Sequence, residues 1–266
     1  MQLLPGVGRL SVVALSALLA CAPPPVQWTG ERTVVAASST VALTSSGAVI
    51  DDSLAHVLTR LAPPTVSCAG SLRLASSGGK LFAVWWAPRA DSTATLASAY
   101  TSDGGATWST VVPVDSTDQG MSGCARTPPA IAADAASGYV HVTYAMLAAE
   151  GPGLFFAHSM DGGASFHAPV PILYGERLGR TSVASAGDRV VVAFEDPNSR
   201  TPRIGLALSR TMGHIFEVRL LPVSDDNGAA TSPLVAVQQR HMTVAWQERA
   251  ASTGDVVLRV RTGTIP

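Results

Sequence analysis

Charged side chains are scarce in this chain. They make up 14% of its 266 residues, against about 25% in an ordinary soluble domain. Lys80 is the only lysine, and 18 basic residues face 19 acidic ones, which gives a formal net charge of −1. Nucleic-acid binding needs a basic surplus to neutralise phosphates, so the composition argues against nucleic acid as a partner. A disordered chain is excluded as well, because apolar residues reach 47%.

Long apolar runs are equally few. The only one lies near the N-terminus, where Arg9 precedes residues 10–20. The run is long enough for a signal peptide but short for a transmembrane helix, which needs about 20 residues. It ends in Leu18-Leu19-Ala20-Cys21, which resembles the lipobox of bacterial lipoproteins. The resemblance implies cleavage before Cys21 and lipidation of its thiol, with a plain signal peptide as the alternative.

These features predict three regions in the chain. The first is a signal peptide over residues 1–21, the second a Pro-rich spacer over 22–27, and the third one folded domain over 28–266. Residue 22 is alanine, whereas an aspartate there would resemble an inner-membrane retention signal. We therefore expect the lipid to anchor the chain in the outer membrane, on its periplasmic or surface side, with no other membrane contact.

Cysteine is rare too. With Cys21 assigned to a lipid, Cys68 and Cys124 remain. In the oxidising compartment that an exported chain reaches, two thiols suggest one disulfide. It would close a loop of roughly 56 residues and stabilise the fold by about 4 kcal/mol. The alternative is a pair of buried free thiols.

A short pattern, Ser/Thr-x-Asp-x-Gly-x-Thr/Ser-Trp/Phe, repeats three times at intervals of about 50 to 60 residues. Its copies are residues 101–108, 159–166 and 209–216, and in the last copy Thr211 replaces the aspartate. Short apolar runs flank each copy, and in the first unit these are residues 72–75, 81–86, 96–100 and 109–114. Their alternation and their β-branched residues favour strands. Four short strands per unit predict the blades of a β-propeller.

The repeated pattern resembles the Asp-box, or BNR repeat, of sialidase-like propellers. The resemblance implies a hairpin between the third and fourth strands of each blade. In such a hairpin the aspartate accepts backbone N–H bonds, the second glycine supplies a positive φ, and the aromatic residue packs back onto the blade. We expect this structural role, without a metal ion, for six residues: Asp103, Gly105, Trp108, Asp161, Gly163 and Phe166.

A propeller must join its last blade to its first, or an open edge remains. The fourth unit, residues 231–266, has a third strand at 255–260 and then ends. Residues 28–35 look like an orphan fourth strand, so we predict that they complete the last blade. The fold class is therefore an all-β propeller of four blades. Residues 37–64 are left over as a short helix or part of a fifth blade.

Chain direction places the loops between blades at the end opposite the hairpins, which is the ligand-binding end in sialidases. There, Arg126-Thr127-Pro128 is similar to the Arg-x-Pro of that family, whose arginine binds a carboxylate, and Arg180 holds the matching place one blade later. Guanidinium groups bind carboxylates bidentately, although these arginines could instead pair with acids and tie blades together. The candidate ligand-binding residues are Arg126, Arg180, Tyr144, Glu195, Asp196, Glu248 and Arg249.

Catalysis in the sialidase family uses a tyrosine nucleophile. No tyrosine stands late in the chain, where that nucleophile lies, and three clustered arginines are not visible. We therefore name no catalytic residue, cofactor or metal. The expected function is a non-catalytic module that binds a glycan or an envelope or extracellular protein. The alternatives are a glycoside hydrolase acting on sialic-acid-type carboxylated sugars and a purely structural scaffold.

Overall fold

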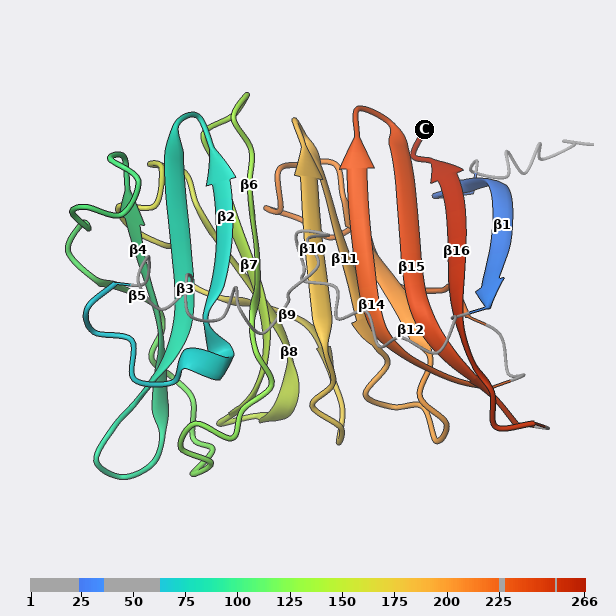
Figure 1. The fold of residues 1–266 in the computed structure, drawn as a ribbon, viewed down its shortest axis with the longest axis horizontal. Coiled ribbons are helices and arrows are strands. Elements are labelled where there is room, and N and C mark those ends of the chain that lie inside the picture. Colours follow the sequence, from blue (N-terminus) through green and yellow to red (C-terminus); the bar gives the residue numbers. More distant parts are fainter. Residues whose placement is uncertain (1–23, 36–62, 225–227, 252) are drawn as a thin grey trace, which may run out of the picture.

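The computed structural model describes residues 24–35, 63–224, 228–251 and 253–266, and nearly all of the regular structure is β-strand (Figure 1). The exception is one turn of 3-10 helix, Ala69–Ser71. The strands form four antiparallel sheets of four strands each. Among these residues no helix is long and apolar enough to cross a membrane. The predicted all-β fold of four-stranded blades is confirmed.

Each sheet is one blade, and its strands follow one another outward from an inner strand. Blade I holds β2 (Arg73–Ser77), β3 (Lys80–Pro88), β4 (Ala94–Thr101) and β5 (Val112–Asp115). Blade II holds β6 (Ala130–Ala133), β7 (Val140–Ala148), β8 (Gly151–Ser159) and β9 (Val170–Tyr174). Blade III holds β10 (Thr181–Ala186), β11 (Arg189–Glu195), β12 (Ile204–Ser209) and β13 (Val218–Pro222). Blade IV holds β14 (Gly228–Gln238), β15 (His241–Ala250), β16 (Val256–Thr264) and β1 (Gln27–Val35).

The N-terminal strand completes the last blade. β1 pairs antiparallel with β16, from Gln27 opposite Thr264 to Val35 opposite Val257. This is the strand that the sequence predicts over residues 28–35. Blade IV therefore joins the two ends of the described chain. The leftover stretch 37–64 lies almost entirely outside the described residues.

The four blades form an open fan rather than the closed ring that we expected. They follow one another along the longest axis, with β5 and β1 toward its two ends (Figure 1). The inner strands contact each other in the order β2, β6, β10 and β14. The physical reason lies in the outer faces of the end blades. Val66 and Leu72 cover Trp85 on blade I, and β15 turns polar residues such as Gln247 outward on blade IV.

Between the blades, side chains from facing sheets interlock. Strand alternation sends Phe82, Val84 and Trp86 of β3 toward blade II, where Val142 and Tyr144 of β7 meet them. Similar clusters join blade II to III and blade III to IV. Burial of each large apolar side chain contributes about 1.5–3 kcal/mol. Stacking of blades is therefore the main source of stability.

The Asp-Gly-Gly hairpins are held by their aspartates. Asp103 accepts bonds from the Thr107 N–H at 2.9 Å and the Thr107 hydroxyl at 2.6 Å. Asp161 accepts the same two bonds from Ser165, at 2.9 and 2.6 Å. The hydrogen bonds from Thr107 hold the pKa of Asp103 well below its usual range. In the third copy the Thr211 hydroxyl accepts the Ile215 N–H at 2.9 Å, which replaces one carboxylate bond.

A glycine of each later hairpin lies against the preceding blade. Gly163 has φ +86°, and a Cβ there would lie 3.1 Å from Phe82 of blade I. Gly213 has φ +88°, and a Cβ there would lie 2.5 Å from Phe156 of blade II. Both positions require glycine for its backbone conformation and for the close approach. The hairpins therefore set the spacing between blades as well as closing them.

Gly213→Ala is expected to destabilise the fold more than Gly138→Ala. Both glycines have positive φ, at +88° and +73°, but nothing lies within 4 Å of a Cβ at Gly138. Each substitution carries a backbone penalty of about 1–2 kcal/mol, and the clash with Phe156 adds about 1–3 kcal/mol. Urea unfolding of the two variants measures the difference. Equal losses would contradict the packing role of Gly213.

Four histidines gather at the interface of blades II and III. His141 and His158 are buried and lie opposite each other on β7 and β8. The ring centroids of His167 and His214 lie 4.8 and 4.6 Å from that of His158. In blade I the equivalent cross-strand pair is Phe82 and Tyr100. Neither ring nitrogen of His141 or His158 has a hydrogen-bond partner, so this interface buries neutral imidazoles in place of aromatic rings.

Acid is expected to weaken this interface. Burial, followed by the neighbouring histidines, lowers the pKa of His141 to about 3 and that of His158 to about 4. An unfolded histidine titrates near 6.5, so below about pH 6.5 the unfolded chain binds more protons and stability falls as pH falls. Urea midpoints measured from about pH 7 to about pH 4.5 test this.

The double variant His141→Phe/His158→Tyr copies the aromatic pair of blade I and is the matched control for that titration. It is expected to lose most of the pH dependence in this window. The hairpin carboxylate of Asp161, whose pKa is lowered to about 2, titrates below the window. An unchanged pH profile in the double variant would contradict the assignment to these histidines.

Candidate functional site

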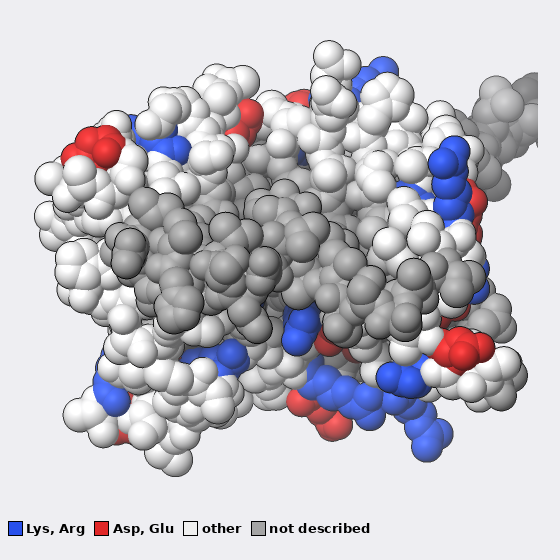
Figure 2. Space-filling model, viewed as in Figure 1, with Lys and Arg blue, Asp and Glu red and all other residues white. Residues whose placement is uncertain are grey.

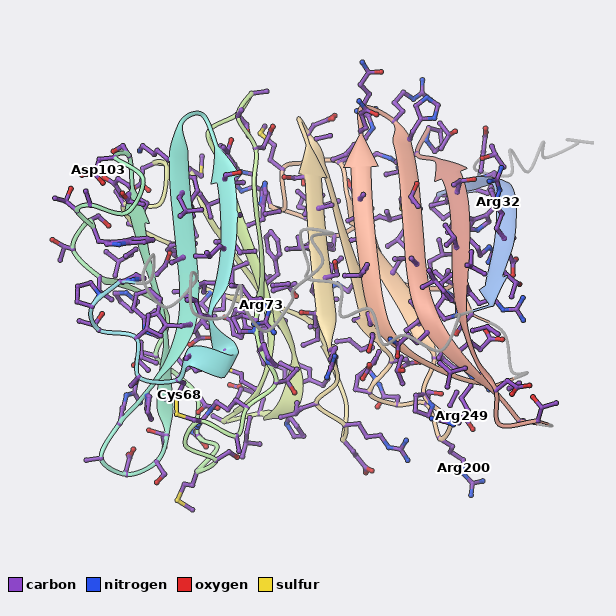
Figure 3. The ribbon with its side chains drawn as sticks, in the orientation of Figure 1. Arg32, Cys68, Arg73, Asp103, Arg200 and Arg249 are labelled. Atoms are coloured by element: carbon purple, nitrogen blue, oxygen red, sulfur yellow. A yellow bond between two sulfur atoms is a disulfide. The ribbon has the colours of Figure 1, made fainter. Side chains whose placement is uncertain are left out.

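The end of the fan opposite the Asp-Gly-Gly hairpins holds the loops that carry the predicted ligand-binding residues. These are the β3–β4, β7–β8 and β11–β12 loops and the segments that lead from one blade to the next. Figure 3 shows Asp103 at the hairpin end and Arg200 and Arg249 at the opposite end. In the view of Figure 2, basic side chains gather along the lower edge of the molecule, below blades III and IV.

Arg126 is a structural residue, which corrects its prediction as a carboxylate ligand. Its side chain is 6% exposed and pairs with Asp118, 2% exposed, at 2.6 Å. It also donates to the carbonyls of Gly120 and Gly123. These partners belong to the segment between β5 and β6, and a further bond from Nη2 reaches the Ser92 carbonyl in the β3–β4 loop at 3.1 Å. The ion pair that we kept as the alternative is present, with Asp118 as the acid.

The disulfide between Cys68 and Cys124 fixes the same region. Its Cα atoms lie 5.3 Å apart, and it joins residues 56 positions apart in the chain. Cys68 precedes the 3-10 turn before blade I, and Cys124 precedes Arg126 before blade II. The predicted pairing of equivalent positions in adjacent blades is confirmed. Together with the Arg126 ion pair it makes the link between blades I and II rigid.

Tyr144 lies in the core and not at the mouth, which corrects the second prediction. The residue is fully buried, and its hydroxyl donates to Asp115 Oδ2 at 2.6 Å. Its ring meets that of Trp86 edge-on, with centroids 5.9 Å apart. Burial, followed by the Asp115 charge, raises its pKa well above the ordinary value. Such a phenol stays protonated and out of reach of a ligand.

The acidic candidates also serve the fold. Glu248 is buried and accepts hydrogen bonds from Arg259 and from the Trp246 indole. The prediction that Glu248 binds a ligand is therefore corrected as well. Asp196 accepts the Asn198 N–H and shapes the β11–β12 loop. The last arginine of the set, Arg249, is exposed and donates to the Gly254 carbonyl at 2.9 Å.

Arg180 is exposed, with one long side-chain hydrogen bond from Nη1 to Ser232 Oγ at 3.5 Å, and it has a neighbour that the sequence reasoning missed. Arg73 is the first residue of β2 in blade I. The positive charge of Arg180, which directly precedes blade III, acts on it. Burial, followed by that charge, lowers the pKa of Arg73. Neither guanidinium forms an ion pair with an acid among the described residues. Figure 3 shows Arg73 beside β2, near the middle of the fan.

The surroundings of this arginine pair hold it in place. Arg73 Nη1 donates to the Leu72 carbonyl at 2.7 Å. Glu195 accepts the backbone N–H groups of Arg180 and Ser232, at 3.2 and 2.8 Å, so its carboxylate ties blade III to blade IV. Among the first strands of the four predicted units, only residues 72–75 contain a charged residue, which is Arg73. This charge in an otherwise uncharged type of strand was the signal that could have identified it.

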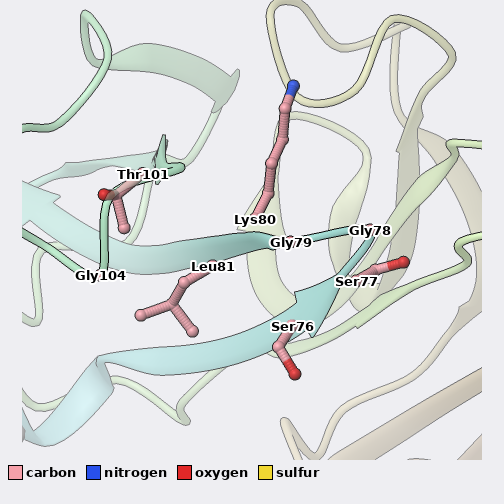
Figure 4. Close-up of a pocket in the computed structure, with 8 residues that line it drawn as sticks. All are labelled: Ser76, Ser77, Gly78, Gly79, Lys80, Leu81, Thr101 and Gly104. Atoms are coloured by element: carbon pink, nitrogen blue, oxygen red, sulfur yellow. The ribbon is translucent and has the colours of Figure 1, made fainter.

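Two hollows open on the surface away from these arginines. One, of about 400 Å³, lies at the hairpin end of blade I between the Gly78-Gly79 turn and Gly104 (Figure 4). Lys80 lines it, with Nζ 4.2 Å from the Tyr100 ring centroid. The other, of about 830 Å³, is a cleft between blades I and II at the opposite end. Over the described ranges no group of three or more metal-ligating residues is arranged to hold a metal ion.

Asp118→Asn is expected to destabilise the chain by about 3–5 kcal/mol, because it leaves the Arg126 guanidinium buried without its counter-charge. Asp188→Asn, which removes an exposed ion pair with Arg189, is the control and should have little effect. Denaturant unfolding under oxidising conditions measures both. Equal, small losses would contradict a structural role for the Arg126 pair.

Comparison with known proteins locates the fold. No family model and no curated protein matches the chain. The solved structure of the Hadza microbial sialidase Hz136 is similar with a TM-score of 0.51 and 17% identity, over 74% of this chain and 46% of that one. The solved structure of a protein of unknown function from Dyadobacter fermentans DSM 18053 is similar with a TM-score of 0.53 and 16% identity, over 72% of this chain and 52% of that one. The chain thus spans about half the length of these structures, and the likeness shows a sialidase-like propeller fold.

Proposed function

We propose that the chain is an exported, lipid-anchored module that binds a carboxylated glycan without hydrolysing it. The observation that carries the proposal is the Arg73–Arg180 pair. Neither guanidinium forms an ion pair with a carboxylate of the described residues, and burial together with the charge of Arg180 lowers the pKa of Arg73. A carboxylate on a sugar would supply the missing counter-charge and can accept paired N–H bonds from a guanidinium.

Similarity of fold supports a glycan as the partner. The structure with 17% identity is described as a sialidase, and the repeated hairpins resemble the Asp-boxes of that family. Arg180 lies in the segment that leads into blade III, at the end that the resemblance implies for ligand binding, and Arg73 begins strand β2. Fold alone does not decide function, so the arginine pair is the feature to test.

The state of the other candidates favours binding over catalysis. Tyr144, the tyrosine among the predicted site residues, is buried, and its hydroxyl donates a hydrogen bond to Asp115. The guanidinium of Arg126 is held in an ion pair with Asp118. A sialidase-like hydrolase needs an accessible nucleophile beside the sugar ring, and Tyr144 in this state does not provide one.

Export and anchoring belong to the same proposal. The lipobox-like Cys21 lies outside the described residues, and the Cys68–Cys124 disulfide supports an oxidising compartment such as the envelope. Metabolic labelling with a lipid precursor, compared between the wild-type chain and Cys21→Ser, tests the anchor.

A glycan array probed with the full oxidised chain tests the binding. We expect binding of glycans that carry carboxylates, a loss of about tenfold or more in Arg180→Ala and Arg73→Ala, and no change in Arg200→Ala, which removes an exposed arginine elsewhere. Carboxylated glycans bound equally well after loss of both arginines would contradict the proposal. Hydrolysis of a fluorogenic sialoside that disappears in Tyr144→Phe would favour the hydrolase alternative.

A further inference from the structure

The cleft between blades I and II is a second concave site, built from other elements than the arginine pair. Its volume is about 830 Å³, within the range of about 300–1,000 Å³ in which small-molecule sites fall. Blade I contributes Arg89 and Asp91 from the β3–β4 loop, and blade II contributes Glu150 and Tyr174. Its floor is apolar and includes the buried Met146 and Phe155.

Tyr174 forms an aromatic wall of fixed orientation. Its cross-strand partner on β8 is Gly153, and a Cβ there would lie 3.1 Å from Tyr174 Cδ1. The tyrosine ring therefore occupies the space over β8 that a side chain at position 153 would fill. The Phe155 ring supports it edge-on, with centroids 5.8 Å apart and planes at 86°. The residue is still 40% exposed, so part of the supported ring is open to a ligand.

Among the charged groups of the cleft, the guanidinium of Arg89 is engaged in hydrogen bonds, whereas carboxylate oxygens of Asp91 and Glu150 are free. Arg89 is occupied, because its Nη2 donates to Thr95 Oγ1 at 2.9 Å and to the Ser116 carbonyl at 2.6 Å. Asp91 uses only Oδ1, which accepts the hydroxyl and N–H of Thr93. Glu150 is exposed, and no donor among the described residues reaches its carboxylate. The cleft thus offers carboxylate oxygens beside an aromatic ring.

We propose that this cleft binds a saccharide unit that carries no carboxylate, with an apolar C–H face of the sugar against Tyr174 and its hydroxyls donating to Glu150 and Asp91. A sugar ring combines one apolar face with a polar edge, and the cleft presents the complementary combination. Asp91 and Glu150 together outnumber the single Arg89 guanidinium of the cleft, which disfavours an acidic sugar. The site does not depend on Arg73 or Arg180, so one chain holds two saccharide sites of opposite charge preference.

Titration of the full oxidised chain with maltotriose, cellotriose and N-acetylchitotriose, one at a time by calorimetry, tests the proposal. We expect at least one of these uncharged probes to bind with a Kd of about 1 mM or tighter. Tyr174→Ala should weaken that binding by about tenfold or more, Glu150→Gln should weaken it less, and Tyr174→Phe, which keeps the ring, should retain it. N-acetylneuraminic acid should not compete.

Matched controls separate this site from the arginine pair and from loss of folding. Ile215→Ala and Asp255→Asn remove an exposed apolar and an exposed acidic residue elsewhere and should leave binding unchanged. The double variant Arg73→Ala/Arg180→Ala should keep uncharged-probe binding while it loses carboxylated glycans. Failure of all three probes to bind, binding that survives Tyr174→Ala, or binding that vanishes in the double arginine variant would each overturn the proposal.

Discussion

Stacking of sheet on sheet is the constraint on which the rest of this structure depends. The central blades bury both faces, so β8, β11 and β12 are almost continuously buried. Strands covered on both sides are mostly apolar, and the buried polar residues of β7 and β8, such as Thr143 and Ser159, carry no charge. The low charge content of the chain follows from that requirement. Most charged chemistry is left to the loops, and Arg180 and the charged residues of the cleft lie in the loops opposite the hairpins, whereas Arg73 begins strand β2.

The repeat allowed much of this to be predicted. The hairpin pattern, the four strands per blade, the N-terminal strand of blade IV and the Cys68–Cys124 pairing could all be inferred, because each follows from local chemistry repeated at a fixed interval. The open fan was missed, although a signal was present. Residues 241–244 of β15 alternate polar and apolar side chains, which is typical of a strand with one face in solvent, whereas residues 190–194 of β11 are apolar throughout.

Site residues were harder to predict because a strand reverses its face with every residue. Val140 pairs with Ser159 as Leu81 pairs with Thr101, so Tyr144 corresponds to Trp85 and not to Trp86. Its side chain therefore points into the interface with blade I. Arg126 was misjudged for another reason. Its partner Asp118 lies only eight residues earlier, and their pairing depends on a loop conformation that sequence periodicity does not encode.

The path of β1 determines on which side of the molecule a tether at either end of blade IV is attached. Gln27 and Thr264 lie opposite each other in neighbouring strands, and His241 of the β14–β15 turn pairs with Thr264. Both ends of blade IV therefore leave the fold beside the hairpins, on the side remote from the arginine pair and the cleft. A tether placed at either end, whether lipid, tag or solid support, would present the same loops outward and leave both saccharide sites facing the surrounding solution.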